Sequence, residues 1–156
     1  MAQAPDRPIA ILFGSESGNA EAAAGQVRDF LSKAGHDSRV IDMQDFEGEK
    51  LIDEPLVLIV TSTYGNGDPP FNAMDLHDYI DRDDVDLRGL RFAVCALGDS
   101  TYTYFARCGR EFDEFLEARG AKRITERVDV DGHELLDVKV QEFSEAVISY
   151  LATTQG

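Results

Sequence analysis

The residues best suited to chemistry lie in a small, hydroxyl-rich turn near the N-terminus. This turn, GSESGNAE over residues 14–21, leads from an apolar run into a helix-like segment. Backbone N–H groups at a helix start attract anions, and Ser15, Ser17 and Asn19 can add side-chain hydrogen bonds. Because the turn contains no Lys or Arg and lacks the ending of a P-loop, it is typical of a monoester phosphate site. An ordinary helix cap is the alternative for this turn taken alone.

Two later turns each place an aromatic side chain after an apolar run. The first, TSTYGNGDPPFN over residues 61–72, contains Tyr64, and the second, GDSTYTYF over residues 98–105, contains Tyr102. A tyrosine at the mouth of a sheet offers a flat face to a conjugated ring, and glycines let backbone amides approach a ligand. An exposed Tyr on a Gly-Asn-Gly turn is the alternative for the first. The joint occurrence of three such turns predicts one ligand site.

Apolar runs alternate with helix-like segments along the chain, and they must position these turns. The third and fourth runs, LVLIV and FAVCAL, are typical of central strands covered on both faces, whereas SRVID alternates like an edge strand. The pattern predicts an α/β fold with a five-stranded parallel, doubly wound sheet, in which ligands bind beyond the carboxyl ends of the strands. Strands are expected at Ile9–Phe13, Ser38–Ile41, Leu56–Thr61, Phe92–Leu97 and Ile124–Val130.

Length and composition indicate one globular domain. The 156 residues have no signal-like N-terminus and no run of about 18 apolar residues, so we expect a cytoplasmic monomer with a core from about residue 9 to 151. The two cysteines, Cys95 and Cys108, are expected to be buried free thiols, without a metal site. The three histidines, at positions 36, 77 and 133, are expected to be solvated side chains.

The charge of the chain restricts its partners. Thirty acidic and 15 basic residues give a formal charge of −15, which repels phosphate backbones and anionic lipid. We therefore expect neither nucleic acid nor membrane as a partner. The same field would speed encounters with a basic protein surface, although solubility is a sufficient alternative explanation. Acids on the candidate ligand loops are expected to concentrate the field there: Asp68, Asp99, Asp129 and Asp131.

The three turns resemble the FMN-binding segments of the flavodoxin family, of the short-chain type. Within that family, GSESGNAE, TSTYGNGDPPFNA and ALGDSTYTYFARCGREFD are particularly similar to the FMN domain of diflavin reductases, of the sulfite reductase flavoprotein and cytochrome reductase type. The resemblance runs from about Ile9 to Leu151. It implies a flavodoxin-like three-layer sandwich, a single FMN-binding domain over residues 1–156, and FMN as the cofactor.

The resemblance also implies roles for individual residues. Residues 15–20 would bind the FMN phosphate, Tyr64 and Tyr102 would flank the isoalloxazine ring, and Asp131 would approach the flavin edge. The backbone of residues 63–67 and 97–102 would line the ring. The cofactor-binding residues expected in this way are Ser15, Glu16, Ser17, Gly18, Asn19, Ala20, Ser62, Thr63, Tyr64, Gly65, Asn66, Gly67, Leu97, Gly98, Asp99, Tyr102, Phe105 and Asp131.

Some positions depart from the family pattern. Ser15 and Ser17 stand where threonines are frequent, which preserves the hydroxyl groups, and Asn66 stands where many relatives carry an acid. Gly65 is expected to permit a peptide rearrangement on one-electron reduction, so that a neutral semiquinone accumulates. We expect no long insertion in the fifth strand, as in short-chain members.

The function implied by the resemblance is one-electron transfer rather than catalysis on a substrate. The donor would be an NAD(P)H-dependent flavodoxin or ferredoxin reductase. The acceptor would be a basic-faced redox enzyme, such as a haem-thiolate monooxygenase, sulfite reductase or a radical enzyme. Two alternatives stay open: a flavodoxin-fold FMN enzyme that reduces a quinone or another small substrate directly with NAD(P)H, and a domain cut from a diflavin reductase. A response regulator is disfavoured because Gly14-Ser15 and Ser62-Thr63 occupy its acidic positions, and a dinucleotide fold because GxGxxG is missing after the first strand.

Overall fold

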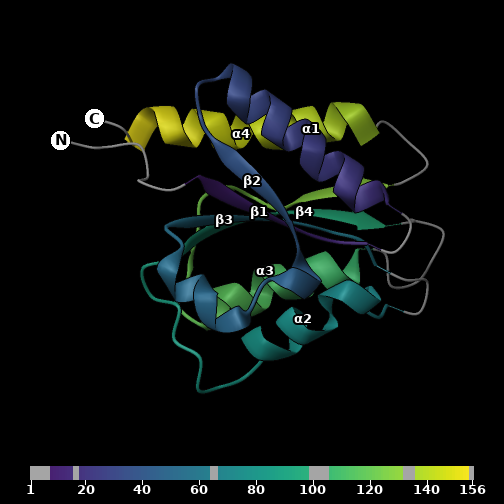
Figure 1. The fold of residues 1–156 in the computed structure, drawn as a ribbon, viewed down its shortest axis with the longest axis vertical. Coiled ribbons are helices and arrows are strands. Elements are labelled where there is room, and N and C mark those ends of the chain that lie inside the picture. Colours follow the sequence, from purple (N-terminus) through teal and green to yellow (C-terminus); the bar gives the residue numbers. More distant parts are fainter. Residues whose placement is uncertain (1–7, 16–17, 64–66, 99–105, 132–135, 155–156) are drawn as a thin grey trace.

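The computed structural model describes residues 8–15, 18–63, 67–98, 106–131 and 136–154 (Figure 1). Strands and helices alternate along them, as the apolar periodicity predicts. Three short 3-10 helices, η1 (Met43–Asp45), η2 (Gly48–Asp53) and η3 (Phe71–Ala73), lie in the connections. The remaining elements are β1 (Ile9–Gly14), α1 (Asn19–Lys33), β2 (Ser38–Asp42), β3 (Leu56–Thr61), α2 (Met74–Ile80), β4 (Arg91–Gly98), α3 (Arg107–Ala118), β5 (Lys122–Arg123), β6 (Val128–Asp131) and α4 (Leu136–Thr154).

The strands form one parallel sheet in the order β2-β1-β3-β4-β5, and β6 also pairs with β4. Strands β3 and β4 are central, as their unbroken apolar runs predict, and within the described residues β2 pairs only with β1. The register places Gly14 opposite Thr61, Thr61 opposite Ala96, and Gly98 opposite Asp131. The carboxyl ends of β1, β3, β4 and β6 therefore lie at the same edge of the sheet.

The fifth strand position differs from the prediction of one strand over residues 124–130. Two short strands occupy it: β5 pairs with the start of β4, and β6 pairs with its end. Residues 124–127, between them, are not in strand conformation. A strand at the edge of the sheet has backbone hydrogen bonds on one side only, so the chain can leave and rejoin the ladder there without disturbing a second neighbour.

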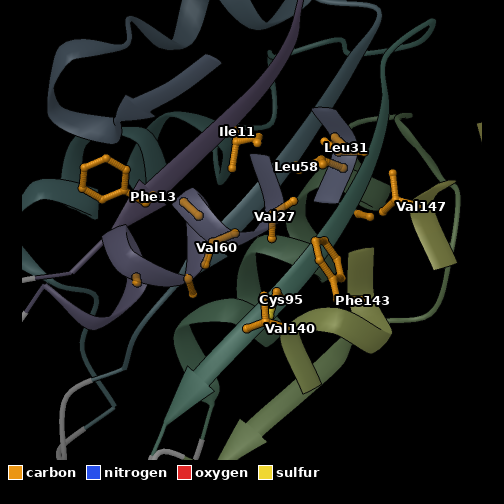
Figure 2. Packing of buried hydrophobic residues seen from close by; sticks show 14 of the residues in the cluster. Ile11, Phe13, Val27, Leu31, Leu58, Val60, Cys95, Val140, Phe143 and Val147 are labelled. Atoms are coloured by element: carbon orange, nitrogen blue, oxygen red, sulfur yellow. The ribbon is translucent and has the colours of Figure 1, made fainter. Parts of the chain in front are cut away.

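Two hydrophobic layers cover the sheet, with α1 and α4 on one face and α2 and α3 on the other (Figure 1). The apolar strand β1 serves both layers, because alternate side chains point to opposite faces: Ile9, Ile11 and Phe13 to the first layer, Ala10 and Leu12 to the second. Figure 2 shows the first layer, in which helix α4 contributes Val140, Phe143 and Val147. Its other labelled residues are Ile11, Phe13, Val27, Leu31, Leu58, Val60 and Cys95.

Helix α3 lies unusually close to the sheet. A Cβ atom added at Gly109 would lie 2.2 Å from the Cβ of Ala96 on β4, so the helix backbone packs directly against the strand. Phe112 and Leu116 continue the buried face of the helix. In the described part of the chain no helix is both long and apolar enough to cross a membrane.

Candidate functional site

The start of helix α1 lies a few residues beyond the end of β1. Gly18 is its N-cap and has a left-handed φ of 85°, a conformation that favours glycine. A glycine has no side chain with which to cap the helix. Among the described residues the first backbone bond at this end runs from the Ala22 N–H to the Gly18 carbonyl, at 3.0 Å. The N–H groups of the first turn, from Asn19 to Glu21, therefore point beyond the helix end, where they can bind an anion.

A hydrogen-bond network that ends on the Asp42 carboxylate holds the turn between β1 and α1. The Ser15 N–H donates to Asn72 Oδ1 at 3.0 Å, and Asn72 Nδ2 donates to Asp42 Oδ1, also at 3.0 Å. Asp42 Oδ1 in addition accepts the Gln44 N–H at 2.9 Å. Asn72 was not among the predicted site residues, although it stands in the same turn as Tyr64. Only the three-dimensional structure shows that this distant amide orients the Ser15 backbone.

Hydrogen bonds join the end of β3 to the end of β1 and to the start of α3. The Ser62 N–H donates to the Gly14 carbonyl at 2.9 Å, and the buried Thr61 hydroxyl donates to the same carbonyl at 3.3 Å. Thr63 Oγ1 accepts the Cys108 N–H at 2.9 Å, which fixes the first turn of α3. A hydroxyl that accepts a bond still carries a proton to donate, so Thr63 keeps the capacity to bind a ligand.

The two cysteines are free and buried, as expected. Burial raises the pKa of Cys95 and of Cys108 to about 12, because a thiolate would lose its hydration in the interior. Both are therefore neutral thiols at ordinary pH and are not candidates for nucleophilic chemistry.

The outer side of this sheet edge carries paired charges. Asp129, expected to add to the negative field, lies within β6, and the Arg127 guanidinium donates to its two oxygens at 2.7 and 3.2 Å. Its charge is thus compensated by a neighbour two residues away, which the sequence pattern RVD does not by itself reveal. Asp68 is exposed, and Asp131 ends β6 opposite Gly98.

One histidine differs from its expected solvated state. The His77 side chain is only 13% exposed, and its Nε2 lies 3.0 Å from Glu111 Oε1 on α3. Its ring contacts the edge of Phe112, with 5.5 Å between the ring centroids. His77 therefore joins α2 to α3. His36 is half-buried, and position 133 lies outside the described residues.

The structure places the described members of the expected cofactor site at the carboxyl edge of the sheet. Ala20 and Leu97 are buried in the same hydrophobic cluster, so any ligand contact they make would come from their backbone. The other described members are Ser15, Gly18, Asn19, Ser62, Thr63, Gly67, Gly98 and Asp131. Eight expected residues lie outside the described part of the chain: Glu16, Ser17, Tyr64, Gly65, Asn66, Asp99, Tyr102 and Phe105.

Comparison with known protein families decides the identity of this arrangement. The flavodoxin family model matches residues 11–145. The chain belongs to the flavodoxin family. Among solved structures, this flavodoxin-family chain is similar to the flavodoxin of Streptococcus pneumoniae TIGR4, with a TM-score of 0.81, 26% identity, and coverage of 94% of this chain and 99% of that one. It is also similar to oxidised flavodoxin 2 from Bacillus cereus, with a TM-score of 0.78, 27% identity, and coverage of 94% and 99%.

The curated relatives of this flavodoxin-family chain include longer proteins. It is 42% identical over 131 residues to the NADPH sulfite reductase flavoprotein alpha-component of Bacillus subtilis (strain 168), covering 83% of this chain and 22% of that protein. It is 50% identical over 117 residues to the corresponding component of Thiocapsa roseopersicina, covering 74% of this chain and 22% of that protein. The chain thus spans about a fifth of the length of these relatives.

FMN is the cofactor of the flavodoxin family and of this chain, which is an electron carrier. The described residues fit this group by the chemistry of their donors. Uncharged N–H groups at the start of α1 suit a phosphate monoester, and residues 14–21 contain no Lys or Arg to clamp a diphosphate. When bound, FMN supplies the redox chemistry, and the protein supplies binding, orientation and electrostatics.

Proposed function

We propose that this chain carries electrons one at a time on FMN, from an NAD(P)H-dependent reductase of the flavodoxin or ferredoxin reductase kind to a separate redox enzyme. The observation that carries the proposal is the open start of α1, just beyond β1, at the same sheet edge as the ends of β3, β4 and β6. A parallel sheet binds its ligand beyond this edge. One compact FMN-binding domain over residues 1–156 then serves as the carrier.

Each loop at this edge has its own role in the proposal. Residues 15–20 bind the phosphate, because their N–H and hydroxyl groups are uncharged donors at a helix start. Tyr64 and Tyr102 flank the isoalloxazine ring, and the backbone of residues 63–67 and 97–102 lines it. Asp131 approaches the flavin edge from the end of β6.

The relatives favour particular partners. Those named above are flavoprotein components of NADPH sulfite reductases, and they match this chain at 42% and 50% identity. Within the proposal, NADPH is therefore the source of electrons at the donor, and sulfite reductase is the favoured acceptor. A haem-thiolate monooxygenase or a radical enzyme would be recognised by the same chemistry if it presented a basic face.

The surface beside the β3 loop supports docking to such a face. Phe71, in η3, is 66% exposed, and Met74, the first residue of α2, is 45% exposed. The exposed Asp75 follows Met74 directly, and the exposed Asp68 lies three residues before Phe71. A small apolar contact surrounded by acids suits a basic partner that must bind quickly and leave quickly. With a formal charge of −15, the whole chain adds long-range attraction.

The phosphate role can be tested by comparing two ligands. Replacing Ser17 by Ala should weaken FMN binding roughly tenfold, because a charge-assisted hydrogen bond is lost, and should leave riboflavin binding unchanged. Flavin fluorescence titration of the apoprotein measures both dissociation constants. Ser32→Ala, exposed at the other end of α1, is the matched control. Equal losses for FMN and riboflavin would contradict the phosphate assignment.

The carrier role can be tested by supplying one partner at a time. NADPH alone should leave the bound FMN oxidised, and NADPH together with a flavodoxin reductase should reduce it. The absorbance of the bound flavin measures both outcomes. Reoxidation by sulfite reductase haemoprotein in a stopped-flow instrument should slow markedly from low to high salt. Asp68→Asn should flatten that dependence, whereas Asp53→Asn, before the amino end of β3, should not. Direct reduction by NADPH alone would instead favour an enzyme acting on small substrates.

A further inference from the structure

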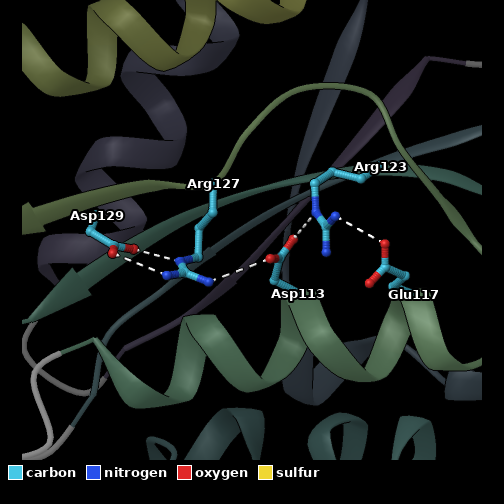
Figure 3. Close-up of polar contacts among 5 residues, drawn as sticks. All are labelled: Asp113, Glu117, Arg123, Arg127 and Asp129. Atoms are coloured by element: carbon cyan, nitrogen blue, oxygen red, sulfur yellow. Dashed lines mark hydrogen bonds and ion pairs between the residues drawn. The ribbon is translucent and has the colours of Figure 1, made fainter.

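Five charged side chains form a connected cluster along the outer edge of the sheet (Figure 3). This charge cluster consists of Asp113 and Glu117 on α3, Arg123 on β5, Arg127 just before β6, and Asp129 on β6. Arg123 Nε donates to Asp113 Oδ1 at 2.8 Å, and its Nη1 donates to Glu117 Oε2 at 3.0 Å. On the other side, Arg127 Nη1 donates to Asp113 Oδ2 at 3.4 Å. The cluster thus joins α3 to both short strands.

Asp113 is the centre of the cluster. Its side chain is 7% exposed, against 60% for Glu117, and its two oxygens bond to two different arginines. These arginines stand at the two ends of the interruption in the fifth strand: Arg123 is the last residue of β5, and Arg127 is the last residue before β6. A buried carboxylate is tolerated only when its charge is paired and hydrogen-bonded, so Asp113 and the two arginines require one another. One side chain on α3 therefore fixes both ends of the interruption.

Arg127 connects Asp113 to the end of β6. Its guanidinium forks onto Asp129 while one nitrogen reaches Asp113. The hydrogen bond with Asp129 raises the pKa of Arg127 above its ordinary value, so the side chain stays charged in any ordinary buffer. Asp129 lies opposite Ala96, and two residues later Asp131 lies opposite Gly98. Among the described residues β6 has a strand neighbour on one side only, β4, so side-chain contacts can add to a register that central strands obtain from backbone bonds on both sides.

We propose that Asp113 is a positioning residue for the FMN site: through Arg127 it holds the carboxyl end of β6, and with it Asp131, beside the carboxyl end of β4 at Gly98. The proposal rests on the proposed function, which places the flavin ring at this edge. Asp113 lies on α3, and its side chain bonds to Arg123 and Arg127. It acts through these arginines rather than on the ligand. Its effect should therefore fall on the ring side of FMN, not on the phosphate.

The experiment compares Asp113→Asn with Glu117→Gln, a matched removal of charge at the exposed end of the same cluster. Dissociation constants for FMN and for riboflavin are measured by fluorescence titration of the full-length apoprotein, well below its unfolding temperature. Asp113→Asn should weaken both ligands about tenfold and leave their ratio unchanged, because the phosphate turn follows β1, two strands away from β4. Glu117→Gln should leave both within about twofold. The visible circular dichroism of bound FMN should change only in Asp113→Asn.

A second pair of variants covers the case in which Asp113→Asn does not fold. Arg127→Gln keeps the bond between Asp113 and Arg123 and removes only the link to β6, so it should reproduce the tenfold loss. Arg127→Lys should recover only part of the affinity, because an ammonium cannot fork onto Asp129 and reach Asp113 together. Both can be titrated with the same two ligands.

Two outcomes would overturn the proposal, and a third would overturn the proposed function on which it rests. Unchanged affinities in Asp113→Asn and Arg127→Gln, with only a lower unfolding temperature, would mean that the cluster is purely structural. A loss for FMN without a loss for riboflavin would place the effect at the phosphate. A wild-type protein that binds neither flavin would instead overturn the proposed function, which the wild-type titration reveals separately.

Discussion

On the side of β1 and β3, the candidate site is held by hydrogen bonds between uncharged groups, buried or partly buried, and by close packing. On the side of β6, it is held by ion pairs. The inner side consists of the Ser15, Thr61 and Thr63 hydrogen bonds, together with the close approach of α3 to β4 at Gly109. The outer side consists of the charge cluster around Asp113. The difference follows from position in the sheet, because β3 has a strand on each side, whereas β6 pairs with β4 alone in the part of the chain that the structure describes.

This contrast shows how one fold can hold a ligand site rigidly on its inner side and adjustably on its outer side. Close packing tolerates no added atom, since buried neighbours cannot move away. Ion pairs near the surface tolerate substitution better, but they depend on salt, and a salt bridge contributes least where both partners are exposed. We therefore expect the inner side to respond to shape and the outer side to charge.

The largest effect should come from adding one methyl group on the inner side. In Gly109→Ala the new Cβ would lie 2.2 Å from the Ala96 Cβ and 2.8 Å from its Cα, so helix or strand must shift. We expect the free energy of unfolding to fall by about 3 kcal/mol in urea denaturation. Gly25→Ala, in helix α1, is the control: the nearest atom to its new Cβ lies 3.8 Å away, and the variant should be more stable by roughly 0.5 to 1 kcal/mol. Similar stabilities for the two variants would contradict the close packing.

The next effect is the response of the inner side to alkaline pH through Cys108. Burial raises the pKa of Cys108 to about 12 in the folded protein, against about 8.5 in an unfolded chain. Below pH 8.5 both states hold the proton, and between pH 8.5 and 12 only the folded state does. Stability should therefore fall as pH rises, by about 2 kcal/mol from this thiol at pH 10.

The measurement for Cys108 is the slope of unfolding free energy against pH. Cys108→Ala removes a buried group and lowers stability at every pH, but it should make the slope between pH 8.5 and 10 smaller. Cys95, whose pKa is also raised to about 12 by burial, should leave a similar slope behind in that variant. Identical slopes for wild type and Cys108→Ala would mean that the thiol ionises in the folded state.

A smaller effect is expected at Asn72, which holds the turn after β1. Asn72→Ala removes the acceptor of the Ser15 N–H and the donor to Asp42, and we expect a loss of about 1 kcal/mol in unfolding free energy. Gln44→Ala is the control. Gln44 is exposed and bonds to Asp42 through its backbone N–H, so removing its side chain should change the unfolding free energy little. If Asn72→Ala also weakens FMN more than riboflavin, the network orients the phosphate turn. An Asn72→Ala protein as stable as wild type would show that the turn holds its shape without the amide.

The inner side of the site is also the side that the sequence predicts better. Its strands are unbroken apolar runs whose period and length leave one interpretation, and parallel strands place their following turns at one edge. The outer strand was predicted as one segment because residues 124–130 are favourable for a strand. The side chains that meet across its interruption are Asp113, Arg123 and Arg127, and they come together only after α3 packs on the sheet. Likewise, His77 looks like a surface residue in the sequence until Glu111 and Phe112 approach it from another helix.

The smallest expected effect separates the exposed end of the charge cluster from its buried centre. Glu117 is 60% exposed and contacts Arg123 alone within the cluster, so Glu117→Gln should lower the unfolding free energy by only about 0.2 to 1 kcal/mol at low salt. In 1 M NaCl, where the screening length is about 3 Å, the difference from wild type should vanish. Asp113→Asn should keep most of its destabilisation at high salt, because salt reaches a side chain that is 7% exposed much less effectively. Urea titrations of both variants at 0.05 and 1 M NaCl make the comparison, with Gly109→Ala as the uncharged reference whose deficit should not change with salt. If Asp113→Asn lost its deficit in 1 M NaCl as Glu117→Gln does, the centre of the cluster would behave as an exposed pair, and the outer border would be held by the β4–β6 backbone bonds instead.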